Sequence, residues 1–242
     1  EDLQNPINRY ATQVYSSDGK LLGTWNYNRE NRVLVDYTKL SPALVQALVA
    51  TEDVSFYEHS GIDFYALARA VIKRGILGQK SAGGGSTITQ QLAKQLYSEH
   101  AKTTMERVLQ KPIEWVIAVK LERNYTKDEI ITMYLNYFDF LHNAVGIKTA
   151  SNTYFSKEPK DLTVNEAATL IGLCKNPSYY NPVRNPERSC ERRNVVLGQM
   201  VKAGCLSQAD YDKFSAEPIQ LHFHVSDHKD GIAPYFRDYL RR

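Results

Sequence analysis

The sequence predicts a mainly α-helical fold that begins with a short β-hairpin. Two capping boxes, Thr126-x-x-Glu129 and Thr163-x-x-Glu166, each precede an apolar run, so helices should begin near residues 127 and 164. Residues 11–27 instead alternate apolar and polar positions on both sides of Asp18-Gly19. That alternation is typical of two strands joined by a tight turn.

The remaining elements follow in chain order. Ser41-Pro42 is a cap residue followed by proline at the first helical position, which predicts a helix over residues 41–53. Prolines interrupt residues 176–186, and a further helix is expected over residues 187–203. We therefore expect three parts: a lead-in with the hairpin at 1–36, a main domain at 37–217, and a connector toward a further domain at 218–242.

The composition is that of a globular chain. Of its 242 residues, 43% are hydrophobic and 24% are charged, which is enough to bury a full core. A net charge of +3 is too small to indicate nucleic acid, although it suits an anionic ligand or an anionic membrane surface. No run approaches the roughly 18 apolar residues of a membrane span, so we expect any anchor to lie outside this chain.

The cysteines predict neither a disulfide framework nor a structural metal. Cys174, Cys190 and Cys205 cannot all pair, and no Cys/His spacing matches a zinc site. We therefore expect that no cofactor is required. A divalent metal is possible, but nothing in the sequence indicates one.

A glycine run leads into a polar helix start between Gly83 and Lys94. Three successive glycines let backbone N–H groups turn toward an anion, and the following helix N-terminus adds donors and a favourable dipole. Thr87, Gln90, Gln91 and Lys94 fall within about 100° of one another around that helix. The segment predicts a phosphate-binding site. The alternative is a loop followed by an ordinary amphipathic helix with a solvated face.

Two glutamates fall on apolar helix faces. Glu52 lies in the middle of the apolar face of the 41–53 helix, and Glu114 follows Pro112 at an expected helix start and projects into an apolar face. A desolvated carboxylate has a raised pKa, which makes it a useful general base near neutral pH. The alternative for each is a structural salt bridge with a basic residue. Two such carboxylates beside an anion site favour a catalytic site.

Five motifs in chain order carry a resemblance. They are residues 50–61 (ATEDVSFYEHSG), 84–94 (GGSTITQQLAK), 111–114 (KPIE), 125–136 (YTKDEIITMYLN) and 175–182 (KNPSYYNP). Together they resemble the motifs of the peptidoglycan glycosyltransferase domain of class A penicillin-binding proteins, glycosyltransferase family 51. Arg192, Arg193 and Asn194 also fit that pattern.

The resemblance implies a fold and an activity. The fold would be a lysozyme-like helical large lobe with a small membrane-facing lobe at about residues 63–82. The enzyme would polymerise lipid II into β-1,4-linked glycan with inversion, releasing undecaprenyl pyrophosphate on the periplasmic side of the bacterial cytoplasmic membrane. Its partners would be lipid II, the growing undecaprenyl-linked glycan chain and that membrane; other wall-synthesis proteins stay open, and no nucleic acid is implied.

The same resemblance implies roles residue by residue. Glu52 would be the base that deprotonates the acceptor 4-hydroxyl, and Glu114 the second catalytic glutamate near the leaving pyrophosphate. Asp53, Phe56 and His59 would shape the cleft, with a purely structural role as the alternative for His59. The other substrate-binding residues, most of them at the pyrophosphate, would be Ser86, Thr87, Gln90, Gln91, Lys94, Arg107, Lys111 and Asn136.

One departure from the family pattern affects the charge of the site. The third motif usually carries arginine before its lysine, whereas Gln110 precedes Lys111 here. Arg107, one helical turn earlier, would supply the missing cation, because residues three and four apart share a helix face. Lys102 is the alternative source.

Residues 63–82 combine apolar positions with Arg69, Lys73 and Arg74, which suits a helix at a membrane interface. An ordinary core-facing helix is the alternative.

Two rival functions also stay open: a muramidase that cleaves glycan, and a non-catalytic scaffold for wall synthesis. A muramidase needs no pyrophosphate site, and a scaffold would tolerate the loss of Glu52, which this chain retains.

Overall fold

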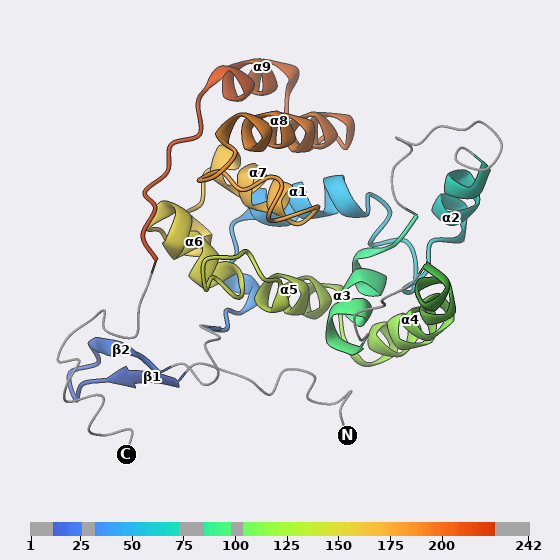
Figure 1. Cartoon of the computed structure of the whole chain (residues 1–242), viewed down its shortest axis with the longest axis horizontal. Helices are drawn as coiled ribbons and strands as arrows, with labels where there is room; N and C mark the ends of the chain where they lie inside the picture. Colours follow the sequence, from blue (N-terminus) through green and yellow to red (C-terminus); the bar gives the residue numbers. More distant parts are fainter. Residues whose placement is uncertain (1–11, 26–31, 73–84, 98–103, 226–242) are drawn as a thin grey trace.

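The computed structural model describes residues 12–25, 32–72, 85–97 and 104–225, and within these ranges the chain is mainly helical (Figure 1). Its first two elements are strands, β1 (Thr12–Tyr15) and β2 (Leu21–Trp25), which pair antiparallel. A short 3-10 turn, η1 (Tyr37–Lys39), then leads into the helices. Everything after it in the described ranges is helix or connection.

The centre of the molecule is a stack of three helices, α1 (Pro42–Glu52), α7 (Val164–Leu173) and α8 (Pro186–Lys202). α1 packs against both α7 and α8, and α9 (Gln208–Ala216) covers the outer side of α8. The expected starts hold: the Ser41 side chain accepts from the Leu44 N–H, and Thr163 and Glu166 form a complete capping box. Fully buried side chains such as Leu44 and Leu48 of α1 fill the core between these helices.

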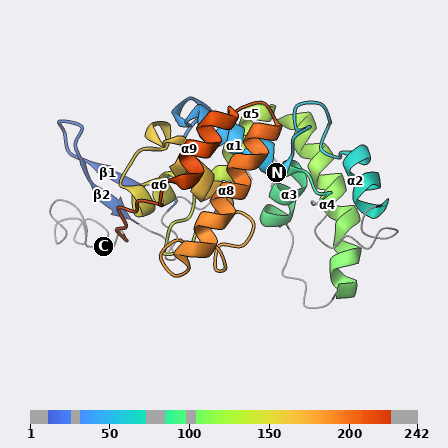
Figure 2. The same ribbon diagram turned by 90° about the horizontal axis from the view of Figure 1, so that it is seen from above.

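A second group of helices lies beside this stack. α5 (Lys127–Tyr137) begins at the expected capping box of Thr126 and Glu129, and it is followed by α6 (Ile147–Phe155) and the 3-10 turn η3 (Pro159–Asp161). α3 (Ile88–Tyr97) packs against α5 and against the long α4 (Thr104–Asn124). α2 (Phe64–Val71) stands apart from the central stack, beside α4, in both ribbon views (Figure 2).

The start of α4 corrects the sequence prediction. The helix begins at Thr104 and continues through Pro112, which therefore lies inside it rather than at its first turn. Proline removes one backbone hydrogen bond there, and the helix accepts that loss because its inner face packs along α3. Nor is the apolar surface of α4 buried all round, because Leu109, Ile113 and Val116 are each more than half exposed.

Candidate active site

Glu52 and Glu114 line one hollow of about 590 Å³ between α1, α3, α4 and α8. Glu52 is the last residue of α1, and its side chain is 16% exposed. Glu114 comes from the middle of α4 with a side chain that is only 3% exposed. The wall of this hollow also includes Thr51, Ser86, Gln90, Gln91, Lys94, Lys111, Cys174, Lys175, Arg192, Val195 and Gln199.

We call this the cationic hollow, because four basic side chains line it together with the two carboxylates. The four are Lys94, Lys111, Lys175 and Arg192. Lys111 makes an ion pair with Glu114, with 2.7 Å between Nζ and Oε2, and its Nζ lies 3.5 Å from the Ser86 hydroxyl. The surplus of positive charge would favour a ligand with several negative charges. The hollow can therefore hold a polyphosphate group next to Glu52.

The carboxylate of Glu52 is held at both oxygens. Oε2 accepts a hydrogen bond of 2.9 Å from the Gln91 carboxamide nitrogen, and Oε1 lies 3.8 Å from Nη2 of Arg192. The Gln91 oxygen in turn accepts from the Tyr134 hydroxyl at 3.2 Å. Because an ionised carboxylate can only accept, the amide nitrogen faces Glu52, and the amide oxygen is left to accept from the Tyr134 hydroxyl. Burial raises the pKa of Tyr134 well above its usual value, so this donor stays protonated.

A second hollow of about 490 Å³ adjoins the cationic hollow at Glu52. It shares Thr51, Glu52, Ser86, Gln91 and Gln199 with the cationic hollow, so these residues stand between the two. Arg69, Lys202 and the N-cap residue of α2, Asp63, belong to the second hollow alone. The Glu52 side chain therefore borders both hollows.

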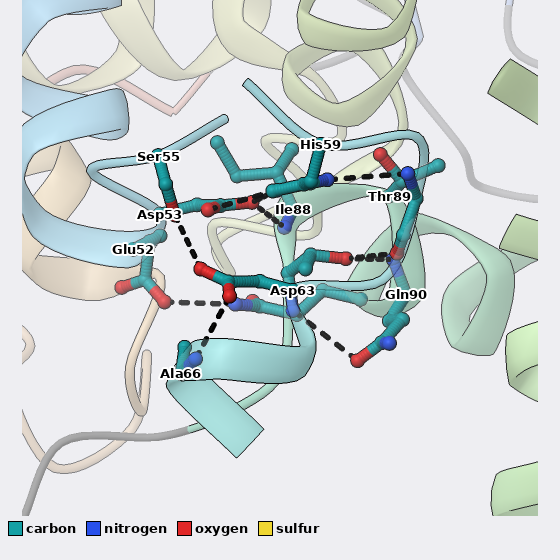
Figure 3. Close-up of polar contacts among 12 residues, drawn as sticks. Glu52, Asp53, Ser55, His59, Asp63, Ala66, Ile88, Thr89 and Gln90 are labelled. Atoms are coloured by element: carbon teal, nitrogen blue, oxygen red, sulfur yellow. Dashed lines mark hydrogen bonds and ion pairs between the residues drawn. The ribbon is translucent and has the colours of Figure 1, made fainter. Parts of the chain in front are cut away.

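Asp53, the residue after Glu52, pairs with His59 (Figure 3). The buried Asp53 carboxylate accepts from the Ile88 backbone N–H at 3.0 Å, which caps α3, and contacts His59 Nε2 at 2.9 Å. His59 Nδ1 accepts from the Gly61 N–H at 3.1 Å, so Nε2 is the nitrogen that donates to Asp53. This arrangement corresponds to the structural alternative for His59, because both of its ring nitrogens are already bonded within the protein.

Thr87 and Gln90 of the second motif bond to each other at the start of α3. The Thr87 N–H donates to the Gln90 side-chain oxygen and the Gln90 N–H donates to the Thr87 hydroxyl, so the two close the N-terminus of α3 as a capping box. The Thr87 hydroxyl also donates to the Gly61 carbonyl at 2.7 Å. Both residues are buried and these polar atoms are bonded within the protein, although Gln90 lines the cationic hollow and Thr87 the second hollow.

Two other expected site residues lie away from the hollows. Asn136 is buried, and its carboxamide pairs with both the N–H and the carbonyl of Val35, which fixes the chain before α1. Phe56 is fully buried, with Lys127 Nζ 4.3 Å from its ring centre. Neither side chain can touch a substrate in this arrangement. Arg107 belongs to α4, but its side chain, like all of Lys102, falls outside the described part of the chain.

Several residues of the site carry no local signal in the sequence. Arg192 contacts Glu52 although the two are 140 positions apart in the sequence. Tyr134 reaches Glu52 only indirectly, through its hydrogen bond to Gln91. Cys174 follows α7 and lines the cationic hollow; burial raises the pKa of its thiol, and the nearby charge of Glu52 raises it further. Both effects disfavour the thiolate form of Cys174.

Within residues 12–25, 32–72, 85–97 and 104–225, no three His, Cys, Asp or Glu side chains gather as a metal would require. None of the helices there has the length and apolar character needed to cross a membrane.

Comparison with known proteins gives consistent matches. A family model described as transglycosylase matches residues 18–201. Penicillin-binding protein 1F of Bacillus subtilis is 43% identical over 87% of this chain, and penicillin-binding protein 1A of Escherichia coli is 36% identical over 95% of it. The chain spans only 28% and 26% of the length of these two relatives.

The fold also has a solved counterpart. A crystal structure of penicillin-binding protein 1A from Haemophilus influenzae aligns over 97% of this chain and 24% of its own, with a TM-score of 0.50 and 24% sequence identity. At that identity the match supports the mainly helical architecture alone.

Proposed function

The chain belongs to the transglycosylase family, and we propose that it polymerises lipid II into β-1,4-linked glycan with inversion and release of undecaprenyl pyrophosphate. The observation that carries this proposal is the place of Glu52, between a cationic hollow and a second hollow. A glycosyl transfer from a pyrophosphate donor to a sugar hydroxyl needs such an arrangement. It requires a base between two substrates and positive charge at one of them.

The reaction follows from that geometry. The donor places its pyrophosphate in the cationic hollow, and the acceptor sugar occupies the second hollow. Glu52 takes the proton of the acceptor 4-hydroxyl while the oxygen attacks the anomeric carbon of the donor from the opposite side to the leaving group. The bond from that carbon to the pyrophosphate oxygen breaks, and its electron pair leaves with the pyrophosphate. The configuration at the anomeric carbon is thereby inverted.

The cations act on the leaving group. Lys94 and Lys111, with the Ser86 hydroxyl, would stabilise the charge that grows on the pyrophosphate oxygens. Glu114 would set the position of Lys111 through their 2.7 Å contact. Arg107 stays our proposal for the cation that replaces the usual arginine at position 110, since its backbone lies one helical turn before Lys111 in α4.

We infer a lysozyme-like large lobe and a small lobe at residues 63–82 that faces the membrane. Two sets of exposed apolar side chains support this: Phe64, Tyr65 and Ile72 in and just after α2, and Leu109, Ile113 and Val116 on α4. The basic Arg69 lies among the first set. Such a surface suits the outer face of the cytoplasmic membrane, where lipid II is presented. The remaining parts would be a lead-in at 1–36, the catalytic domain at 37–217 and a connector at 218–242.

The test is incubation of the protein with detergent-solubilised lipid II, followed by separation of the products. We expect glycan polymer and one undecaprenyl pyrophosphate per bond formed. Fragments released from finished cell wall would instead indicate a muramidase. The absence of both products would indicate a scaffold and would overturn the proposal.

A further inference from the structure

We propose that Tyr179 forms a sugar-binding platform that holds the growing glycan outside the cationic hollow; this rests on the proposed function. The platform lies on a row of contacts that begins at Glu52 and runs outward. Arg192 connects the two, because it lies 3.8 Å from Glu52 and its guanidinium lies 5.8 Å from the ring centre of Tyr180. Tyr179 follows at the outer end of this row.

One face of α8 forms a continuous wall along the two hollows and past them. Arg188, Arg192, Val195, Gln199 and Lys202 fall within about 80° of one another around the helix. Lys202 borders the second hollow, Gln199 borders both, and Arg192 with Val195 borders the cationic hollow. Arg188 lies one turn beyond, toward the N-terminus of α8. Figure 2 shows α8 crossing the molecule beside α1, against which it packs.

The ring of Tyr179 is both presented and fixed. Tyr179 is 47% exposed, yet the Arg188 guanidinium lies 4.5 Å from its ring centre and the Tyr180 ring meets it edge-on at 4.9 Å. The backbone is held as well, since the Tyr179 N–H donates to the Asn176 side-chain oxygen at 3.1 Å. A preordered aromatic ring loses little conformational entropy on binding.

The geometry of the reaction directs the glycan toward this ring. The donor pyrophosphate faces Lys94 and Lys111, and the acceptor fills the second hollow. The proposed path of the older sugars of the donor chain runs along α8, past Arg192 and Val195 toward Tyr179. Pyranose rings present flat C–H faces that pack on aromatic rings, and their hydroxyls can accept from Arg188. The class of ligand is thus a β-1,4-linked amino-sugar chain of several units.

Tyr179 lines neither hollow, so a platform there would affect how long the product stays bound and not the bond-forming step. In the Tyr179→Ala variant we expect the rate of the first coupling to match the parent and the mean product length to fall about 2- to 10-fold. Tyr179→Phe keeps the ring and should restore the parent length. Tyr57→Ala is the matched control, because Tyr57 is 55% exposed but borders neither hollow.

Two outcomes of the polymerisation assay would overturn the platform. One is an unchanged product length for Tyr179→Ala, and the other is an equal shortening for Tyr57→Ala. If the parent protein makes no polymer, the proposed function fails and a binding measurement decides the platform. Tyr179→Trp is titrated with a lipid-free oligosaccharide of alternating N-acetylglucosamine and N-acetylmuramic acid. A fluorescence change absent from the parent supports the platform, and no change overturns it.

Discussion

Glu52 is held by two side chains whose effects differ. Gln91 fixes the direction of one carboxylate oxygen through a 2.9 Å hydrogen bond, whereas Arg192 supplies a charge at 3.8 Å from the other. The hydrogen bond sets the geometry, and the charge of Arg192 attracts the carboxylate toward α8. The position of the base therefore depends on Gln91, even though Gln91 itself neither gives nor takes the proton.

The isosteric change Gln91→Glu tests that dependence. It keeps an acceptor for the Tyr134 hydroxyl but replaces the donor facing Glu52 with a second carboxylate. We expect kcat to fall by about 10- to 100-fold, the equivalent of one hydrogen bond to a charged group. Steady-state lipid II polymerisation measures kcat, and the thermal midpoint should stay close to that of the parent. Parental kcat in this variant would remove Gln91 from the positioning of Glu52.

The neutral thiol of Cys174 gives a second prediction. Burial and the nearby charge of Glu52 raise its pKa, while Cys205 is exposed. Since alkylation needs the thiolate, iodoacetamide at pH 7–8 should modify Cys205 well before Cys174. Peptide mass spectrometry over a time course measures both rates, with Cys174→Ala to assign the slow site. Equal rates at the two cysteines would contradict this description of the hollow.

At the residue scale, local patterns predict which residues gather near Glu52 but not the contacts that each one makes. Glu52, Glu114 and Gln91 do line one hollow, together with Lys94 and Lys111. Thr87 and Gln90 were assigned to a ligand, although their T-x-x-Q spacing is the same capping-box signal that located two other helices. The contact of Arg192 with Glu52 joins distant positions, and periodicity cannot reveal such a pair.

At the element scale, the site depends on the loop between α1 and α2. Gly61 in that loop has a φ of +95°, and a Cβ there would lie 3.0 Å from the backbone carbonyl of Ala118 in α4. Its own carbonyl accepts the Thr87 hydroxyl that caps α3. The loop can therefore lie against α4 and still support α3 only if residue 61 is glycine.

Gly61→Ala should lower the free energy of unfolding through both strain and crowding. The positive φ costs about 1–2 kcal/mol, and the contact with Ala118 adds about 1–3 kcal/mol. Gly204→Ala is the matched control, because Gly204 also has a positive φ but open space around it. Denaturant unfolding compares the two variants. A loss for Gly61→Ala no larger than for Gly204→Ala would show that the close approach to α4 carries no cost.

The exposed apolar face of α4 belongs to the same scale. Ile113 and Val116 are each 58% exposed, so Ile113→Ser combined with Val116→Ser should barely change the thermal midpoint. If this face contacts a bilayer, binding to vesicles containing anionic lipid should fall, as measured by co-sedimentation. Val183→Ser, an exposed position that lines neither hollow, serves as the control. A large stability loss with unchanged vesicle binding would instead mark the face as part of the folded core.

At the scale of the whole molecule, the sequence predicted the helical architecture but not how its parts face one another. Caps and apolar periodicity located α1, α5 and α7 because those signals are local. The start of α4 was missed because Pro112 suggested a first turn, while packing along α3 lets the helix continue through it. The wall that α8 supplies to both hollows arises from tertiary packing, which no local pattern encodes.

Glu52 is central to the proposed reaction, because this residue lines both hollows. The most direct measurement is lipid II polymerisation by Glu52→Gln, which keeps the shape of the side chain and removes the base. The matched control is Glu58→Gln, the same change at an exposed position outside both hollows. We expect Glu52→Gln to lose about 10²–10⁴-fold in rate with its fold intact, and Glu58→Gln to match the parent. Polymerisation by Glu52→Gln at near the parental rate would contradict the assignment of Glu52 as the base.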